Sequence, residues 1–330
     1  MKVLITGGAG YIGSHVALEA LQEGFDVTVF DDLSTGSTNN LHRKIDFVFG
    51  STTSKKDLNN LFIRKSYDFV IHLAASKAVS ESMKNPIQYS DNNIIGGLNL
   101  IRFCLEFKVK CFIFSSTAAV YGKPKQVPIS ELHSLNPLNY YGYTKLSIEK
   151  NLEWISKLTK LNYISLRYFN AAGYDIKNRI KGVEKNPQNL IPRVMEVALG
   201  LKDQIHVFGD DFETKDGTGV RDYIHVSDLA KAHIKAIYYL KKQKENLVVN
   251  LGTGEGHSVL DVIKATQKIS QKRIEYVIEG RREGDAANVI ASGRLAKEKL
   301  NWHPIESDLS TIISSTWDIY KVSQIFHPTK

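Results

Sequence analysis

Cysteine and long apolar runs are both scarce in this sequence, and their scarcity excludes several classes of protein. The 330 residues include two cysteines, Cys104 and Cys111, both in apolar surroundings typical of buried thiols. Cysteine and histidine are not grouped at zinc-binding spacing, so we predict no metal site. No apolar run approaches the ~18 residues that a membrane span needs. Because Met1-Lys2-Val3 leads straight into a strand-like segment, we expect no signal peptide, no membrane partner and a cytoplasmic location.

Clustered positive charge is also lacking, although the net charge is +8. Lysine and arginine are spread along the chain as short pairs such as Lys55-Lys56 and Lys272-Arg273. A nucleic-acid-binding surface would gather them on one face among aromatic residues, so we expect no nucleic-acid partner. Diffuse positive charge instead favours the approach of an anionic small substrate.

Neither glycine nor proline is in excess, and 42% of the residues are hydrophobic, so the chain can bury a large core. Its first half alternates short apolar runs with helical stretches. This alternation predicts an α/β fold with a doubly wound, Rossmann-like parallel sheet covered by helices on both faces. The expected strands are 2–6, 26–31, 46–50, 68–73, 111–116 and 163–168, and the expected helices are 11–23, 55–65, 86–107 and 139–160.

A glycine-rich segment, 6–13, follows the first expected strand and leads into a helix. Its spacing is Gly-x-x-Gly-x-x-Gly. Such a turn brings backbone N–H groups and the positive end of a helix dipole close to a diphosphate. Asp31 ends the second expected strand. A ribose-binding carboxylate is expected roughly 20 residues beyond the glycines, and Asp31 lies close to that position. No arginine follows before Arg43, so the sequence predicts NAD, and not NADP, as the cofactor.

The pattern changes after about residue 170, where glycine and proline interrupt the chain. Strand-like runs at 205–208 and 274–279 and helices at 258–269 and 293–300 predict a second, smaller α/β lobe. We expect residues 1–170 to form the NAD-binding domain, with 226–250 returning to it, and residues 171–330 to form mainly the substrate-binding lobe. Ligands bind beyond the carboxyl ends of parallel strands, so the site is expected there.

Tyr141 and Lys145 stand four residues apart at the head of an expected helix. At ~100° per residue they lie about 40° apart and share one face, whereas Tyr140 and Tyr143 point elsewhere. A lysine ammonium beside a phenol lowers the tyrosine pKa, and a bound nicotinamide cation would lower it further. We therefore expect Tyr141 to act as a general base near neutral pH.

Upstream, residues 115–117 carry hydroxyl groups and end a buried strand. A substrate oxygen would need a hydrogen bond at this place.

These segments together resemble the extended short-chain dehydrogenase/reductase superfamily, and within it the UDP-glucose 4-epimerase (UDP-galactose 4-epimerase) family. The resemblance covers nearly the whole chain and is most specific at 217–226 and 281–285. It implies an NAD-dependent isomerase that interconverts UDP-galactose and UDP-glucose. C4 of the sugar would be oxidised, the 4-keto sugar would rotate, and C4 would be reduced from its other face. It also implies a UDP-sugar partner and a homodimer, with helices 86–107 and 139–160 as contact surfaces.

The resemblance also assigns roles to individual residues. The catalytic residues would be Thr117, Tyr141 and Lys145. The NAD-binding residues would be Gly7, Gly10, Tyr11, Ile12, Gly13, Asp31, Asp32, Leu33, Ser34, Thr35, Gly36, Ser51, Thr52, Leu73, Ala74, Ala75, Lys77, Asn92, Tyr141, Lys145 and Phe169. The UDP-sugar would be bound by Thr117, Tyr141, Asn170, Asn189, Leu190, Phe208, Arg221, Arg282, Asp285 and Val289. Two arginines suit a diphosphate because a guanidinium pairs bidentately with phosphate oxygens.

Three positions depart from the family pattern. Thr117 replaces a serine and keeps its hydroxyl. The segment 50–52, Gly-Ser-Thr, replaces Gly-Asp-apolar and removes a carboxylate from one adenine contact. Val289 replaces a tyrosine that closes the sugar pocket in some members, so we expect space for N-acetylated UDP-hexosamines.

Other functions remain as alternatives. Nucleotide-sugar dehydratases and decarboxylases share the fold but carry acidic residues after the strand-end hydroxyl. Ala118 and Ala119 stand there in this sequence and cannot move protons. Epimerisation of a different nucleotide sugar is a third alternative. A non-catalytic NAD-binding protein is the fourth, and the intact set of Thr117, Tyr141 and Lys145 argues against it.

Overall fold

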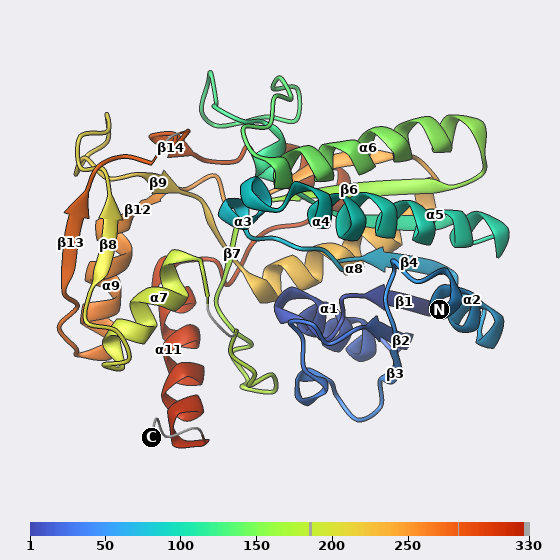
Figure 1. The fold of residues 1–330 in the computed structure, drawn as a ribbon, viewed down its shortest axis with the longest axis horizontal. Helices are drawn as coiled ribbons and strands as arrows, with labels where there is room; N and C mark the ends of the chain where they lie inside the picture. The colour runs from blue at the N-terminus through green and yellow to red at the C-terminus, as the bar shows by residue number, and fades with distance from the viewer. Residues whose placement is uncertain (185–186, 283, 327–330) are drawn as a thin grey trace.

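The computed structural model describes residues 1–184, 187–282 and 284–326, and it shows one large sheet with a smaller lobe beside it (Figure 1). All neighbouring strands of the large sheet are parallel. In spatial order they are β11 (Leu247–Leu251), β6 (Asn162–Tyr168), β5 (Cys111–Thr117), β4 (Phe69–His72), β1 (Lys2–Thr6), β2 (Asp26–Asp31) and β3 (Asp46–Phe49). The order reverses between β1 and β4, as in a doubly wound sheet. The predicted fold class is therefore confirmed.

Helices cover both faces of this sheet. On one face α1 (Tyr11–Gln22) and α8 (Val226–Gln243) pack over side chains such as Val3, Ile5 and Ile71. On the other face α2 (Lys55–Arg64), α5 (Gly96–Glu106) and α6 (Tyr140–Leu158) enclose a second core that includes Leu4 and Phe112. The separation of α1 and α8 from α5 and α6 is clear in Figure 1. Because both faces are buried, the middle of several strands is a continuous apolar run, such as Val3-Leu4-Ile5 in β1 and Phe112-Ile113-Phe114 in β5.

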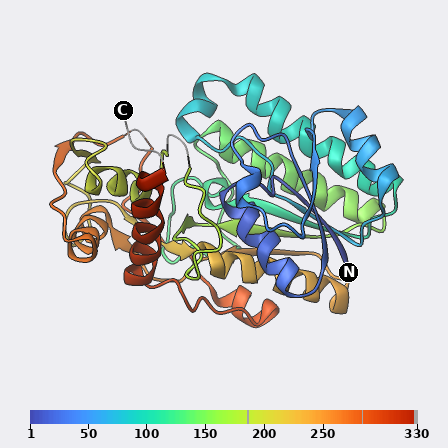
Figure 2. The ribbon, with the colours of Figure 1, turned by 90° about the horizontal axis from the view of Figure 1, so that it is seen from below.

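The smaller lobe contains three short sheets around its own core. Its helices are α7 (Leu190–Ala198), α9 (Val259–Ser270) and α11 (Leu309–Phe326), and Figure 2 shows α11 on the side that faces the large sheet. Its strands are β7 (Asn170–Ala172) with β10 (Tyr223–His225), β8 (Ile205–Phe208) with β13 (Tyr276–Glu279), and β9 (Val220–Arg221) with β12 (His257–Ser258) and β14 (Asn288–Val289). The helix expected at 293–300 forms as α10 (Arg294–Leu300), but its place in the smaller lobe is wrong, because Ala296 and Leu300 pack into the core of the large sheet.

The expected single helix over 86–107 is wrong. The chain forms α3 (Val79–Lys84) and α4 (Pro86–Tyr89), then a π-helical turn over Ser90–Ile95, before α5 begins. The extra residue in such a turn re-aims neighbouring side chains, and π turns are frequent at functional sites. Here Asn93 in the turn donates to the hydroxyl of Thr144 on α6 and to the carbonyl oxygen of Ser76.

Of the helices in the described part of the chain, none combines the length and the apolarity that a bilayer crossing requires. Cys104 and Cys111 are both free and buried, and burial raises the pKa of both thiols.

Candidate active site

The glycine turn between β1 and α1 is tightly packed. Gly7 has φ +71°, and its N–H donates to the carbonyl oxygen of Phe30 at 2.9 Å. A Cβ on Gly13 would lie 2.1 Å from the carbonyl oxygen of Gly7, so only glycine fits there. Gly10 is the N-cap of α1 and offers no capping side chain, and no residue of the first turn is acidic. The positive end of the helix is therefore available to an anion.

Asp31 lies beside this turn at the end of β2. Its carboxylate accepts hydrogen bonds from the backbone N–H groups of Ala9 (3.0 Å) and Leu33 (2.8 Å). Burial raises its pKa, and these two bonds oppose the rise. Gly36 packs directly on Ala9. The structure thus brings the predicted adenosine-binding segment 31–36 against the glycine turn.

This cradle suits a dinucleotide such as NAD. Its turn leaves no space for side chains, its helix end is uncapped, and its strand end carries a carboxylate. The loop after β4 closes the other side of the glycine turn. Ala74 in this loop is so near that a Cβ on Gly7 would lie 2.5 Å from the Ala74 nitrogen. Among the described residues, no group of three or more histidine, cysteine, aspartate or glutamate side chains could hold a metal ion.

Three other predicted NAD-binding residues, Asn92, Lys77 and Thr52, lie in different surroundings. Asn92 donates to the hydroxyl of Ser76 at 2.9 Å, near the loop after β4. Lys77 forms an ion pair with Glu184 of the smaller lobe. Thr52 is buried, and its carbonyl oxygen accepts from Asn99, so its side chain belongs to the domain core.

The three predicted catalytic residues come together at the carboxyl end of β5. Asn139 caps α6 by accepting from the N–H of Gly142 at 2.8 Å, and this fixes where the helix begins. The side chain of Thr117 lies close enough to that of Tyr141 to lower the pKa of its phenol. Lys145 is buried, and its ammonium donates to the carbonyl oxygen of Ser115 at 2.8 Å. Its nitrogen lies 5.8 Å from the centre of the Tyr141 ring.

The expected lowering of the Tyr141 pKa is wrong for the protein alone. Burial raises the pKa of Tyr141 to about 12, and the Thr117 side chain opposes only part of the rise. Burial also lowers the pKa of Lys145 to about 7. Both shifts have one cause, since the charged form of each group loses hydration in the buried site. A phenolate at neutral pH therefore requires further positive charge nearby.

A second charged group of residues lies in the smaller lobe. Arg221 donates to the carbonyl oxygen of Ala286 at 2.9 Å and lies 3.6 Å from the carboxylate of Asp285. Arg282 donates to the same carboxylate at 3.2 Å, and its guanidinium lies 4.3 Å from the centre of the Phe208 ring. Two guanidinium groups around one carboxylate leave a local excess of positive charge in the lobe.

Two predicted residues of different roles share one small cluster. Phe169, predicted to bind NAD, is buried there with Tyr121, and Val289, predicted to bind the sugar, packs at its edge. Asn170 pairs with Tyr223 through β7 and β10.

Asn189 is the N-cap of α7 without using its side chain to cap, and Leu190 packs on the core of the lobe. The amide of Asn189 therefore stays available to a ligand.

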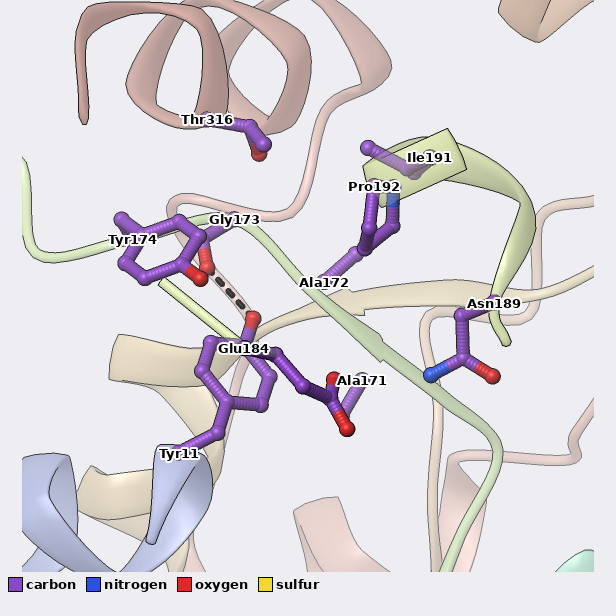
Figure 3. A pocket seen from close by; sticks show the side chains of 10 residues that line it. All are labelled: Tyr11, Ala171, Ala172, Gly173, Tyr174, Glu184, Asn189, Ile191, Pro192 and Thr316. Atoms are coloured by element: carbon purple, nitrogen blue, oxygen red, sulfur yellow. Dashed lines mark hydrogen bonds between the residues drawn. The ribbon is translucent and has the colours of Figure 1, made fainter. Parts of the chain in front are cut away.

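A small cavity lies between the start of α1 and the smaller lobe, and its lining includes Tyr11 and Asn189 but none of Thr117, Tyr141 and Lys145 (Figure 3). Tyr11 stands on one side at the start of α1, and its hydroxyl donates to the carbonyl oxygen of Gly173. Asn189 stands on the other side, and Glu184 lies beside Tyr11. The cavity therefore places a predicted cofactor residue opposite a predicted substrate residue.

Sequence reasoning missed two carboxylates near the site. Glu184 pairs with Lys77 across the boundary between the lobes, and no sequence signal marks it. Glu149 is buried under the catalytic residues and bonds to Ser116 and Arg167. The helical spacing that selects Tyr141 and Lys145 also places Glu149 on their face, and this signal could have found it.

Comparisons with known proteins agree with this geometry. Residues 3–252 match the model of the NAD dependent epimerase/dehydratase family. The chain is 44% identical to a UDP-glucose 4-epimerase of Halalkalibacterium halodurans over 97% of this chain and 96% of that protein.

Solved structures give the same result. The UDP-glucose-4-epimerase from Stenotrophomonas maltophila, with bound NAD and formylated UDP-arabinopyranose, has a TM-score of 0.95, 38% identity and 99% coverage of both chains. The UDP-Glc/GlcNAc 4-epimerase from Campylobacter jejuni has a TM-score of 0.86 and 39% identity, covering 97% of this chain and 99% of that one. The chain belongs to the NAD dependent epimerase/dehydratase family and, within it, to the UDP-glucose 4-epimerases.

Proposed function

We propose that the chain interconverts UDP-galactose and UDP-glucose with NAD held as a resident cofactor. One observation carries this proposal: Thr117, Tyr141 and Lys145 meet at the end of the strand next to β4, beyond the glycine cradle. The family's dependence on NAD and the epimerase relatives support it.

The NAD cradle is assigned to the residues that already line it. The glycine turn and the start of α1 would hold the diphosphate, and Asp31 would accept from the adenosine ribose hydroxyls. Tyr141 and Lys145 would lie at the nicotinamide end. When bound, NAD⁺ supplies the capacity to take hydrogen from C4 of the sugar and return it, and its positive charge favours the Tyr141 phenolate.

Tyr141 acts as the base in this proposal. Its phenolate takes the proton from the 4-hydroxyl while the Thr117 hydroxyl holds the same oxygen. Arg221 and Arg282 hold the diphosphate, so the 4-keto sugar can turn about that link without leaving. Tyr141 then returns the proton to the oxygen of the inverted carbon.

The alternatives receive no support. Dehydration or decarboxylation would need an acid or base next to Thr117, and Ala118 and Ala119 form a short 3₁₀ turn there without titratable groups. The catalytic hydroxyl, phenol and ammonium are all in place, which argues against a binding protein without activity.

The direct test is an assay without added cofactor. We expect the purified protein to convert UDP-galactose to UDP-glucose unaided, because NAD regenerated in each cycle can stay bound. Turnover only after addition of NAD⁺ would show weak cofactor retention, for which the missing carboxylate at Ser51 would be the first suspect. No turnover under either condition would contradict the proposal.

Val289 suggests a broader substrate range. It is half-buried on β14, beside the small cluster of Phe169, and it leaves more space than a tyrosine. The relative from Campylobacter jejuni is described as a UDP-Glc/GlcNAc 4-epimerase. We infer that this chain also accepts UDP-GlcNAc and UDP-GalNAc.

We expect Val289→Tyr to lower kcat/KM for UDP-GlcNAc by about tenfold or more while UDP-glucose is little affected, because the ring would fill the space for the acetamido group. Steady-state kinetics on both sugars would measure the ratio. Val322→Tyr, an exposed position on α11, is the control. An unchanged ratio, or a wild type without UDP-GlcNAc turnover, would sink the idea.

We also propose a homodimer through the α3–α6 region. Large apolar side chains are exposed there, including Met83 (60% exposed), Ile87 (72%), Trp154 (63%) and Leu158 (77%). Burying such side chains against a second copy is favourable. Sedimentation at micromolar concentration is expected to give the mass of two chains, and a single-chain mass would reject the dimer.

The cellular location and the domain limits also stay as proposals. The composition favours the cytoplasm. A division into an NAD-binding part, 1–170 with 226–250, and a UDP-sugar-binding part over most of 171–330 accounts for the positions of the two groups of site residues.

A further inference from the structure

A buried network of charged and polar side chains lies directly beneath the catalytic residues. The carboxylate of Glu149 on α6 accepts from the Ser116 hydroxyl at 2.5 Å and from the Arg167 guanidinium at 2.9 and 2.6 Å. The side chains of Arg167 and Glu149 are only 4% and 5% exposed. The carboxylate thus accepts three hydrogen bonds from donors on β5 and β6.

The network continues across the sheet. Arg167 donates to the hydroxyl of Tyr121 at 2.8 Å, and that hydroxyl donates to the side-chain oxygen of Asn250 at 2.6 Å. The guanidinium also lies 4.9 Å from the centre of the Tyr121 ring. One set of bonds therefore joins α6, β5, β6 and β11.

Its place relative to the active site is specific. Tyr141, Lys145 and Glu149 repeat every four residues and so share one face of α6. Lys145 donates to the carbonyl oxygen of Ser115, Glu149 accepts from the hydroxyl of Ser116, and Tyr141 lies beside Thr117. Three successive turns of the helix thus meet three successive residues of β5, and two of them are hydrogen bonded to it.

We propose that Glu149 and Ser116 are positioning residues for the epimerisation. Their hydrogen bond fixes how far α6 can slide along β5. It therefore keeps the Tyr141 and Thr117 oxygens close together at the carboxyl end of β5. This inference rests on the proposed function. Small displacements matter there, since about 1 Å of misplacement costs on the order of 100-fold in rate.

Stability alone is a weak explanation for such a network. A buried ion pair adds little stability over apolar side chains of the same volume. β6 offers a direct contrast, because Ser165 is equally buried and its hydroxyl has no hydrogen-bond partner.

Ser116→Ala and Ser165→Ala form a matched pair of variants. Both remove one hydroxyl from neighbouring buried strands, and the first also removes a bond to Glu149 while leaving Arg167 in place as its partner. For Ser116→Ala we expect kcat on UDP-galactose to fall about tenfold with KM and bound NAD unchanged. We also expect a larger kinetic isotope effect with deuterium at C4, because the chemical step becomes slower. Ser165→Ala is expected to match the wild type.

The outcomes separate cleanly. Equal kcat and isotope effect in both variants overturn the positioning role. If Ser116→Ala lowers Tm while its isotope effect equals that of the wild type, the role of the bond is structural. That outcome also overturns the proposal. If Ser116→Ala fails to fold, Tyr121→Phe removes the next link, and the same split between kcat and KM is required of it. A wild type without turnover in the same assay would reject the proposed function, and the positioning role would fall with it.

Discussion

Tyr141→Phe is expected to reduce kcat for UDP-galactose by about 1,000-fold, the range typical of removing a general base. In the proposed mechanism the phenol oxygen removes and returns the proton, and phenylalanine has no hydroxyl with which to do so. Coupled detection of UDP-glucose would measure the loss. KM is expected to change little, because Arg221 and Arg282 still hold the diphosphate.

Tyr143→Phe is the control for that variant, since Tyr143 is 49% exposed on the same helix. It should retain wild-type kcat. If Tyr141→Phe kept normal activity, the assignment of the base would be wrong, even though the fold and the family would stand.

Gly13→Ala is expected to remove tight NAD binding. The added Cβ would lie 2.1 Å from the Gly7 carbonyl oxygen and 2.7 Å from the Gly8 Cα, and both are backbone atoms that cannot move without opening the turn. Overpacking of this kind costs about 3 kcal/mol, on the order of 100-fold in Kd. NAD content after gel filtration would measure it.

Gly280→Ala is the matched control, because a Cβ there meets nothing within 4 Å. Its NAD content should equal that of the wild type. Full retention of NAD by Gly13→Ala would show that the diphosphate does not lie on this turn.

The sequence predicts the large sheet well because its strands carry a strong, continuous apolar signal and alternate with helices. It fails at the short strands β7, β9, β12 and β14, which contain two or three residues and so lack any periodicity. The π turn is also invisible, since it depends on contacts that Asn93 makes with Ser76 and Thr144. Local patterns do not encode such tertiary contacts.

The site shows the same limit. Helical spacing selects Tyr141 and Lys145, but it cannot reveal that burial raises the pKa of Tyr141 and lowers the pKa of Lys145. Ion pairs between distant segments, such as Lys77 with Glu184, need the folded chain to appear.

The return of α8 and β11 to the large sheet has a consequence for dissecting the protein. The chain leaves the sheet after β6, passes through β7, α7, β8, β9 and β10, and comes back to pair β11 with β6. A fragment ending near residue 170 would expose the whole edge of β6, including the apolar Ile164 and Leu166, and uncover α1. Exposed apolar edges of this kind promote aggregation. A single cut near residue 170 therefore cannot separate the large sheet from the rest of the chain without exposing this edge.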